Sequence, residues 1–204
     1  MGSETGSIAV ASMARVTLEE REKVLVESRA EWRQWLRDHH AQVQSIWLVS
    51  WKKGRGPYVP YEDRVQEALA FGWIDSLPRK LDGERTMLLM SPRRRGSRWS
   101  AINKAHVAAL EAAGQMTPAG RAKVEQAQAD GNWDALKPVD RLEVPEDLAT
   151  ALGAHPGARR GFDALAPSLR RGLLERLLDA RRPATRQKRL LEIVAEATKP
   201  RRAQ

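Results

Sequence analysis

Two short segments of this sequence carry the residue types from which a small-molecule site is built. The first, residues 70–76 (AFGWIDS), places a single carboxylate, Asp75, after an apolar and aromatic run. The second, residues 91–103 (SPRRRGSRWSAIN), places four arginines, Trp99 and Asn103 around a glycine. Small-molecule pockets have apolar and aromatic walls with a few polar groups. The two segments therefore predict a cleft, although the same residues are also compatible with a packed core beside a solvated basic loop.

Asp75 is the candidate acid or base of this cleft. A carboxylate close to indole rings is open to partial desolvation and to pairing with a nearby arginine. Such a pair could orient an anion or a polar ligand. The structural alternative is that Asp75 caps a turn or holds Arg93 or Arg79.

The arginine loop, residues 92–98, has the makings of an anion site. Guanidinium groups match phosphates and carboxylates, and Trp99 offers a face for stacking. Ser100 and Asn103 follow at a predicted helix start, where free backbone amides favour negative charge. Basic loops are common, so the run alone is unspecific.

The seven tryptophans are divided between cleft and core. We expect Trp51, Trp73 and Trp99 to line the cleft. The remaining four are expected to be structural, either as core anchors or, for the last, as a pin for a connecting segment: Trp32, Trp35, Trp47 and Trp133.

Several kinds of chemistry lack their sequence patterns. Gly54 and Gly56 form a loop too short for a phosphate cradle. The four histidines have no ligand partners at metal-binding spacing, so no metal and no cofactor is predicted. There is no Gly-x-Ser-x-Gly nucleophile elbow, and the absence of cysteine excludes disulfides and thiolate chemistry.

The composition is that of a globular protein, with 42% hydrophobic and 30% charged residues. No stretch approaches 18 apolar residues, so no membrane span is predicted. Residues 1–14 lack the basic and apolar regions of a signal peptide. With the absence of cysteine, these features lead us to expect a cytoplasmic protein.

The net charge of +9 is concentrated near the C-terminus. Residues 158–204 hold 13 Lys and Arg against 5 Asp and Glu, whereas the preceding residues hold 22 against 21. A basic field of this kind attracts nucleic acid or an anionic surface. A solvated helix face is the alternative interpretation.

The apolar patterns predict an α+β fold, predominantly helical, in which helices flank a small sheet and a C-terminal helical subdomain follows. Strands are predicted at 46–51 and 85–91. Ser28 with Glu31 forms a capping box, and Thr185 is expected to cap the last helix. The predicted organisation is a flexible leader (1–25), an α+β body (26–133), a connection (134–143) and a basic helical subdomain (144–204).

Four segments taken in order resemble the bacterial YdeI/OmpD-associated, bacteriocin-protection family. They are residues 31–36 (EWRQWL), 46–53 (IWLVSWKK), 61–75 (YEDRVQEALAFGWID) and 91–103. Residues 114–120 and 185–190 continue the resemblance, which spans about 26–198. One departure is Ala70, where such proteins often have cysteine.

The resemblance implies a protective protein in antimicrobial resistance or envelope stress, with no settled reaction. It also highlights a candidate ligand-binding set: Lys52, Trp73, Asp75, Arg93, Ser97, Trp99, Ser100, Asn103, Thr185, Arg186 and Arg189. The cleft argument adds Trp51 to this set.

Three functions follow from these observations. The leading hypothesis is a binder of a small aromatic or amphipathic molecule, held in the tryptophan cleft with Arg93 and Asn103 meeting its polar groups. The second is an enzyme in which Asp75 is the acid or base and Lys52 or Arg93 stabilises negative charge. The third is a nucleic-acid or anionic-surface binder that acts through the basic residues between 170 and 202. The sequence does not indicate an oligomeric state.

Overall fold

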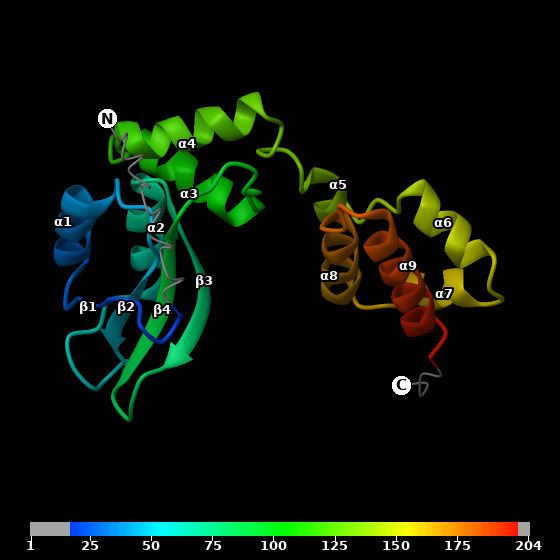
Figure 1. Cartoon of the computed structure of the whole chain (residues 1–204), viewed down its shortest axis with the longest axis horizontal. Helices are drawn as coiled ribbons and strands as arrows, with labels where there is room; N and C mark the ends of the chain where they lie inside the picture. The colour runs from blue at the N-terminus through cyan, green and yellow to red at the C-terminus, as the bar shows by residue number, and fades with distance from the viewer. Residues whose placement is uncertain (1–16, 200–204) are drawn as a thin grey trace, which may run out of the picture. The chain divides into compact units, whose positions relative to one another are not determined.

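The computed structural model describes residues 17–199, which form four strands and nine helices. This confirms the predicted α+β, predominantly helical class (Figure 1). The chain divides into two compact units. Unit 1 runs to Arg93 and includes Met116–Gly120, and unit 2 comprises Arg94–Gln115 and the chain from Arg121 onward. This division differs from the expected one, because residues 94–115 and 121–133 group with the C-terminal helices.

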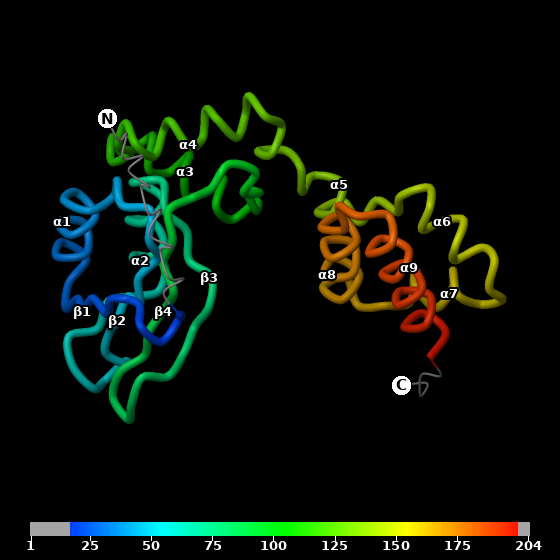
Figure 2. Tube along the Cα trace, in the orientation of Figure 1, coloured from blue at the N-terminus to red at the C-terminus, as the bar shows by residue number. Residues whose placement is uncertain are grey.

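Unit 1 is built on a four-stranded sheet. Its strands are β1 (Lys23–Leu25), β2 (Ile46–Trp51), β3 (Trp73–Lys80) and β4 (Arg85–Pro92), in the spatial order β1-β2-β4-β3. β1 is parallel to β2, and the other pairs are antiparallel. Figure 2 shows β3 and β4 as the two arms of one long hairpin. β2 and β4 agree with the predicted strands.

Two strands were not predicted. β1 lies inside the expected leader, which is therefore too long: residues 23–25 pair with β2, and residues 1–16 lie outside the described part of the chain. β3 lacks a clean apolar alternation and contains Pro78. The sheet tolerates this proline because β3 is an edge strand.

Helices α1 (Arg29–His39) and α2 (Tyr61–Ala70) pack side by side and lie beside the sheet (Figure 1). Ser28 caps α1 as predicted, accepting a 3.1 Å hydrogen bond from the Glu31 amide. The Glu31 carboxylate accepts in return from the Glu27 amide, 2.8 Å away. Gly72 ends α2 with a left-handed φ of 77°.

A buried carboxylate joins the two helices. Glu67 on α2 is only 2% exposed and pairs with Arg29 and Arg33 of α1, each at 2.6 Å. Two guanidinium groups thus supply the partners that a buried carboxylate requires. The pairing fixes which faces of α1 and α2 meet.

Replacing Glu67 with glutamine should therefore destabilise the protein by about 2 kcal/mol, because two buried charge-assisted hydrogen bonds lose their acceptor charge. Urea unfolding followed by circular dichroism measures the change. Glu62→Gln, on the exposed first turn of the same helix, is the matched control and should change the free energy of unfolding by less than about 0.5 kcal/mol. Equal effects of the two substitutions would contradict a stabilising role for the buried pair.

The first turn of α4 (Pro118–Ala129) belongs to unit 1. The Thr117 hydroxyl donates to the carbonyl of Ala70, 2.6 Å away. A Cβ at Gly120 would overlap that same carbonyl oxygen. Glycine is therefore required where this turn meets the end of α2.

Unit 2 contains α3 (Ala101–Ala112), the rest of α4, and five further helices. These are α5 (Lys137–Asp140), α6 (Glu146–Gly153), α7 (Ala158–Asp163), α8 (Pro167–Leu178) and α9 (Pro183–Ala197). The last five surround an apolar core of leucines, with Phe162 and Ile193 among its members. α9 begins at Pro183, so Thr185 lies inside the helix and does not cap it, contrary to the prediction.

Helices α7 and α9 cross in close contact. A Cβ at Gly161 of α7 would overlap the carbonyl oxygen of Ala197 at the end of α9. Backbone atoms cannot move away from such an overlap as a flexible side chain can. Within residues 17–199, no helix is long and apolar enough to cross a membrane.

Gly161→Ala should lower the free energy of unfolding by about 1–3 kcal/mol, because the methyl group forces the two helices apart. The matched control is Gly172→Ala in α8, where an added Cβ meets nothing within 4 Å. That substitution should instead raise stability by about 0.5–1 kcal/mol through helix propensity. Thermal and urea unfolding of both variants test the pair, and two changes of the same sign would contradict the helix contact.

Candidate functional site

Asp75 lies at an irregularity of the β3–β4 hairpin. Asp75 is opposite Met90, and the register resumes with Pro78 opposite Leu88, so β3 contains one extra residue between these pairs. A bulge of this kind bends a strand and redirects its side chains, and bulges are frequent next to functional sites. Here it accompanies a half-buried carboxylate on the edge strand of the sheet.

Tyr61 contacts this carboxylate from the first position of α2. Its hydroxyl donates a 2.7 Å hydrogen bond to Oδ2 of Asp75. Burial, followed by this bond to a carboxylate, raises the pKa of Tyr61 to about 12. The phenol therefore keeps its proton and acts as a donor at physiological pH.

Arg64, one turn further along α2, is 6% exposed and lies beneath Tyr61. Its guanidinium carbon is 5.8 Å from the Tyr61 ring centroid, and its Nη1 donates to the Ser50 hydroxyl at 2.9 Å. Its Nε has no hydrogen-bond acceptor among the described residues. Burial lowers the pKa of Arg64, and the neighbouring Tyr58, Tyr61 and Asp75, in decreasing order, partly oppose that decrease.

Arg93 is the second buried arginine of the group. It follows β4, is 2% exposed, and its backbone amide donates to Gly72 O at 2.9 Å. Burial lowers its pKa to about 10, and the charge of Asp75 opposes that decrease. The charge of Asp75 thus acts on two buried guanidinium groups.

A pocket of about 280 Å³ opens beside Asp75, and we call it the Asp75 pocket. Its polar lining includes Tyr61, Arg64 and Asp75, and its apolar lining is given by Pro78, Met87 and Leu88. Ser76 and Thr86 complete it. The apolar side chains come from the β3–β4 hairpin, and the charged side chains and Tyr61 come from α2 and the start of the bulge.

The hydrogen bond between Tyr61 and Asp75 can be tested by titration. In a Tyr58→Phe background Tyr61 is the only tyrosine, and Asp75→Asn should lower its pKa from about 12 towards the ordinary value near 10. The decrease should be partial, because burial is the larger cause and remains. Ultraviolet difference titration of the phenolate measures it, and unchanged titration would show that Asp75 does not hold the phenol.

The same shift has a consequence for stability. Because the folded state retains the phenolic proton more tightly than the unfolded chain, its contribution to stability is present below pH 10 and is lost between about pH 10 and 12. Tyr61→Phe should remove this segment of the pH dependence of unfolding.

The predicted tryptophan cleft does not form as expected. Trp73 is 0% and Trp99 is 1% exposed, so their rings lie in packed interiors and cannot line an open cleft. Trp73 donates to His40 O at 3.0 Å and meets the Trp35 ring edge-on at 5.7 Å. Trp99 packs against Trp133, with 5.0 Å between the ring centroids.

Trp51 and Lys52 are directed to other partners. The Trp51 indole donates to Glu27 at 3.1 Å, and the Lys52 ammonium donates to Asp82 O and Gly83 O at 2.9 and 2.8 Å. Lys52 thereby holds the β3–β4 turn. Its backbone amide bonds to residue 84, whereas Asp75 is opposite residue 90. Six residues of strand correspond to about 20 Å, so Lys52 does not stabilise charge at Asp75.

The remaining predicted residues have structural contacts. The Ser100 hydroxyl caps α3 by accepting from the Asn103 amide at 3.2 Å, and the Ser97 amide closes a turn onto Arg94 O. Arg186 forms a bidentate pair with Asp147, at 2.5 and 3.0 Å. Arg189 donates to the carbonyl of Arg176. None of these groups lines the Asp75 pocket.

Tyr61 and Arg64 of the pocket were not among the predicted site residues. Arg64 occurs beside Val65 and Ala68 on the inward face of α2. A charged residue at a core position is a signal of a buried polar group with a partner. The alternative pairing of Asp75 with Arg79 is wrong, because Arg79 pairs with Glu19 at 3.0 Å. Among residues 17–199, no group of three or more acidic, histidine or cysteine side chains could hold a metal ion.

The fold and site together define a small α+β protein in which a charged pocket at a hairpin accompanies a separate set of C-terminal helices. Residues 141–199 match the family model described as bacteriocin-protection, YdeI or OmpD-associated. The match supports the family predicted from the sequence.

A different model, a domain of unknown function (DUF8412), matches residues 24–123. Most segments that carried the resemblance lie in that range. The residues of the Asp75 pocket lie there too. The two matched ranges leave residues 124–140 between them, close to the connection expected at 134–143. No curated protein matches the chain, and no solved structure matches it.

Proposed function

We propose that this protein binds a small amphipathic molecule with an anionic group in the Asp75 pocket, and that this binding serves a protective role in antimicrobial resistance or envelope stress. The role follows from the name of the family matched by residues 141–199. The ligand class follows from the lining of the pocket, in which Tyr61 supplies the aromatic ring in place of the expected tryptophans.

The observation that carries the proposal is the buried guanidinium of Arg64 in the pocket lining. Arg64 is 6% exposed, and its Nε has no hydrogen-bond acceptor among the described residues. Buried charge is costly unless it is compensated. An anion that reaches Arg64 would compensate this buried charge through a charge-assisted hydrogen bond.

The rest of the pocket suits an apolar body attached to that anion. Pro78, Met87 and Leu88 offer an apolar wall, and the Tyr61 ring, in a residue that is 52% exposed, offers an aromatic face. A volume of about 280 Å³ is close to the lower end of small-molecule sites. A single substituted ring is of suitable size.

The alternative functions have less support. An enzyme would rely on Asp75 with Tyr61, since Lys52 bonds to the hairpin turn. For a nucleic-acid binder, the relevant charges are the C-terminal arginines, several of which already pair with acids of the same unit: Arg159, Arg171, Arg176 and Arg186. These pairs reduce the field available to phosphates.

Benzoate and benzyl alcohol test the proposal as a matched pair with one ring and different charge. Titration into ¹⁵N-labelled protein should show benzoate binding more tightly, with shifts at Tyr61 and at the residues around the bulge. Arg64→Gln should weaken benzoate binding about tenfold or more, because a charge-assisted hydrogen bond is lost. The control Arg55→Gln, in an exposed loop, should leave the affinity unchanged.

Asp75→Asn gives an independent measure if the Arg64 variant is unstable. It removes the negative charge that competes with the ligand, so benzoate should bind several-fold more tightly. An enzyme would behave differently, losing turnover while binding is kept. Equal affinity for the charged and neutral probes, or unchanged affinity in both variants, would refute an anion site.

A further inference from the structure

The Asp75 pocket is lined by one cation and one anion that do not form an ion pair with each other. Asp75 accepts from the Tyr61 hydroxyl through Oδ2, and its Oδ1 has no hydrogen bond with any residue between 17 and 199. Arg64 donates through Nη1 to Ser50. The charge of Asp75 acts on Arg64 from a distance, although both residues line the same pocket. A ligand in this pocket therefore meets a positive group and a separate negative group.

The hydroxyl groups of the pocket are hydrogen-bond acceptors towards a ligand. Each hydroxyl carries a single proton. Tyr61 donates its proton to Asp75. Thr86 and Ser76 donate theirs to backbone carbonyls of the hairpin, at 2.9 and 3.4 Å respectively. Their oxygens thus offer only lone pairs, so the donor that a ligand can use among the polar side chains of this lining is Arg64.

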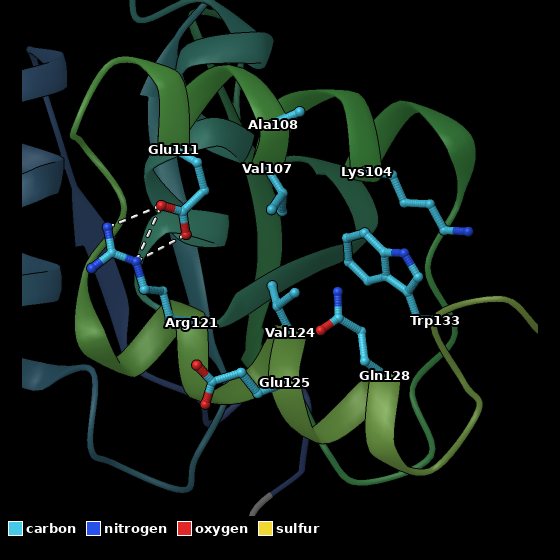
Figure 3. Close-up of a pocket in the computed structure, with 9 residues that line it drawn as sticks. All are labelled: Lys104, Val107, Ala108, Glu111, Arg121, Val124, Glu125, Gln128 and Trp133. Carbon is cyan, nitrogen blue, oxygen red and sulfur yellow. Dashed lines mark hydrogen bonds and ion pairs between the residues drawn. The ribbon is translucent and has the colours of Figure 1, made fainter.

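The pocket between α3 and α4, of about 380 Å³, shows the contrasting case (Figure 3). Arg121 binds the Glu111 carboxylate at two nitrogen–oxygen distances of 2.9 Å, and the charge of Glu125 also acts on it. Lys104 pairs with Asp134 at 3.1 Å. The cations of this second pocket are therefore engaged by acids of the same unit, which Arg64 is not.

A zwitterion satisfies both charges of the Asp75 pocket at once. Its carboxylate matches the guanidinium of Arg64. Its ammonium carries three donors, which suit the Oδ1 atom of Asp75 and the acceptor hydroxyls beside it. A ligand with a carboxylate alone would leave that oxygen without a donor and would bring two negative charges into one small pocket, where they repel each other.

We propose that the ligand of the Asp75 pocket is a free α-amino acid with an apolar side chain of about the size of phenylalanine. This inference rests on the proposed function and names the ligand class of that same site. The carboxylate of the amino acid bonds to Arg64, and its ammonium donates to Oδ1 of Asp75. Its side chain packs on the apolar wall of the hairpin. A peptide is a poorer match, because its ammonium and its carboxylate belong to different residues.

Phenylalanine, 3-phenylpropanoate and 2-phenylethylamine form the test series, since they share one carbon skeleton apart from the charged groups. Titration into ¹⁵N-labelled protein, followed at the residues of the β3–β4 hairpin, measures their affinities. Phenylalanine should bind about fivefold or more tightly than either analogue, because each analogue lacks one charge-assisted hydrogen bond.

Asp75→Asn should move the two acids in opposite directions. Phenylalanine should bind several-fold more weakly because its ammonium loses the countercharge, whereas 3-phenylpropanoate should bind several-fold more tightly because a repulsion is removed. The preference for phenylalanine should therefore disappear. The control Asp38→Asn, an exposed acid on α1, should preserve it.

The comparison of the three probes on the unmodified protein needs no variant, so it remains decisive if Asp75→Asn is unstable. Phenylalanine binding no more tightly than 3-phenylpropanoate would overturn the inference and leave the anion site of the proposed function intact. A preference that persists in Asp75→Asn would also overturn it. Failure of benzoate and of both acids to bind would instead refute the proposed function, and the inference with it.

Discussion

The antiparallel pairing of β3 with β4 determines where the charged groups of unit 1 lie. Trp73 begins β3 in a fully buried position, and the register from Trp73 to Asp75 follows from its pairing with the end of β4. The extra residue before Pro78 then interrupts this ladder next to the carboxylate. Arg93 follows directly after β4 and is buried with it. A slip of one residue would move Asp75 to the other face of the sheet.

Glu67 and Asp75 show two ways in which an acid meets buried or half-buried arginines. Glu67 is buried with two arginines around it and holds two helices together. Around Asp75 the same residue types are present, yet Arg64 and Arg93 are buried and the acid is half exposed. The first acid is closed to solvent, whereas the second lies in the wall of a pocket.

Strands and helix ends could be predicted from the sequence where a single apolar or capping pattern dominated the segment. β2, β4 and the Ser28 cap follow from apolar runs and a capping pattern, and all are present. β3 was missed because its residues alternate poorly and depend on pairing with β4. Such pairing is a tertiary effect that propensity does not contain.

The site was predictable only in part, for a physical reason. Asp75 and Arg93 were identified because a charged residue beside aromatic residues is conspicuous in a sequence. Trp73 and Trp99 were assigned to a cleft, but a ring that can line a pocket can equally fill a core, and burial decides between them. Arg64 could not be identified as a site residue because it stands near the start of an ordinary helix, and only the packed structure shows that its side chain is buried.

The two family models match separate parts of the chain, residues 24–123 and 141–199. The Asp75 pocket lies wholly within the first part, whereas the family name comes from the second. Of the nine residues that line the pocket between α3 and α4, five lie in the first part and four, Trp133 among them, lie in the segment between the two matches. A protein sharing only the C-terminal match would therefore lack the residues of both pockets.

Arg64 has one further implication. Its side chain faces the pocket, while its backbone carbonyl accepts the Trp32 indole at 2.9 Å and so joins α1 to α2. Because the side chain is also buried and donates to Ser50 on β2, substitution at this position will lower the amount of folded protein that a cell accumulates, whatever its effect on a ligand. In a survival screen, a weakened phenotype at Arg64 would be uninformative until the amount of intact protein had been measured beside it.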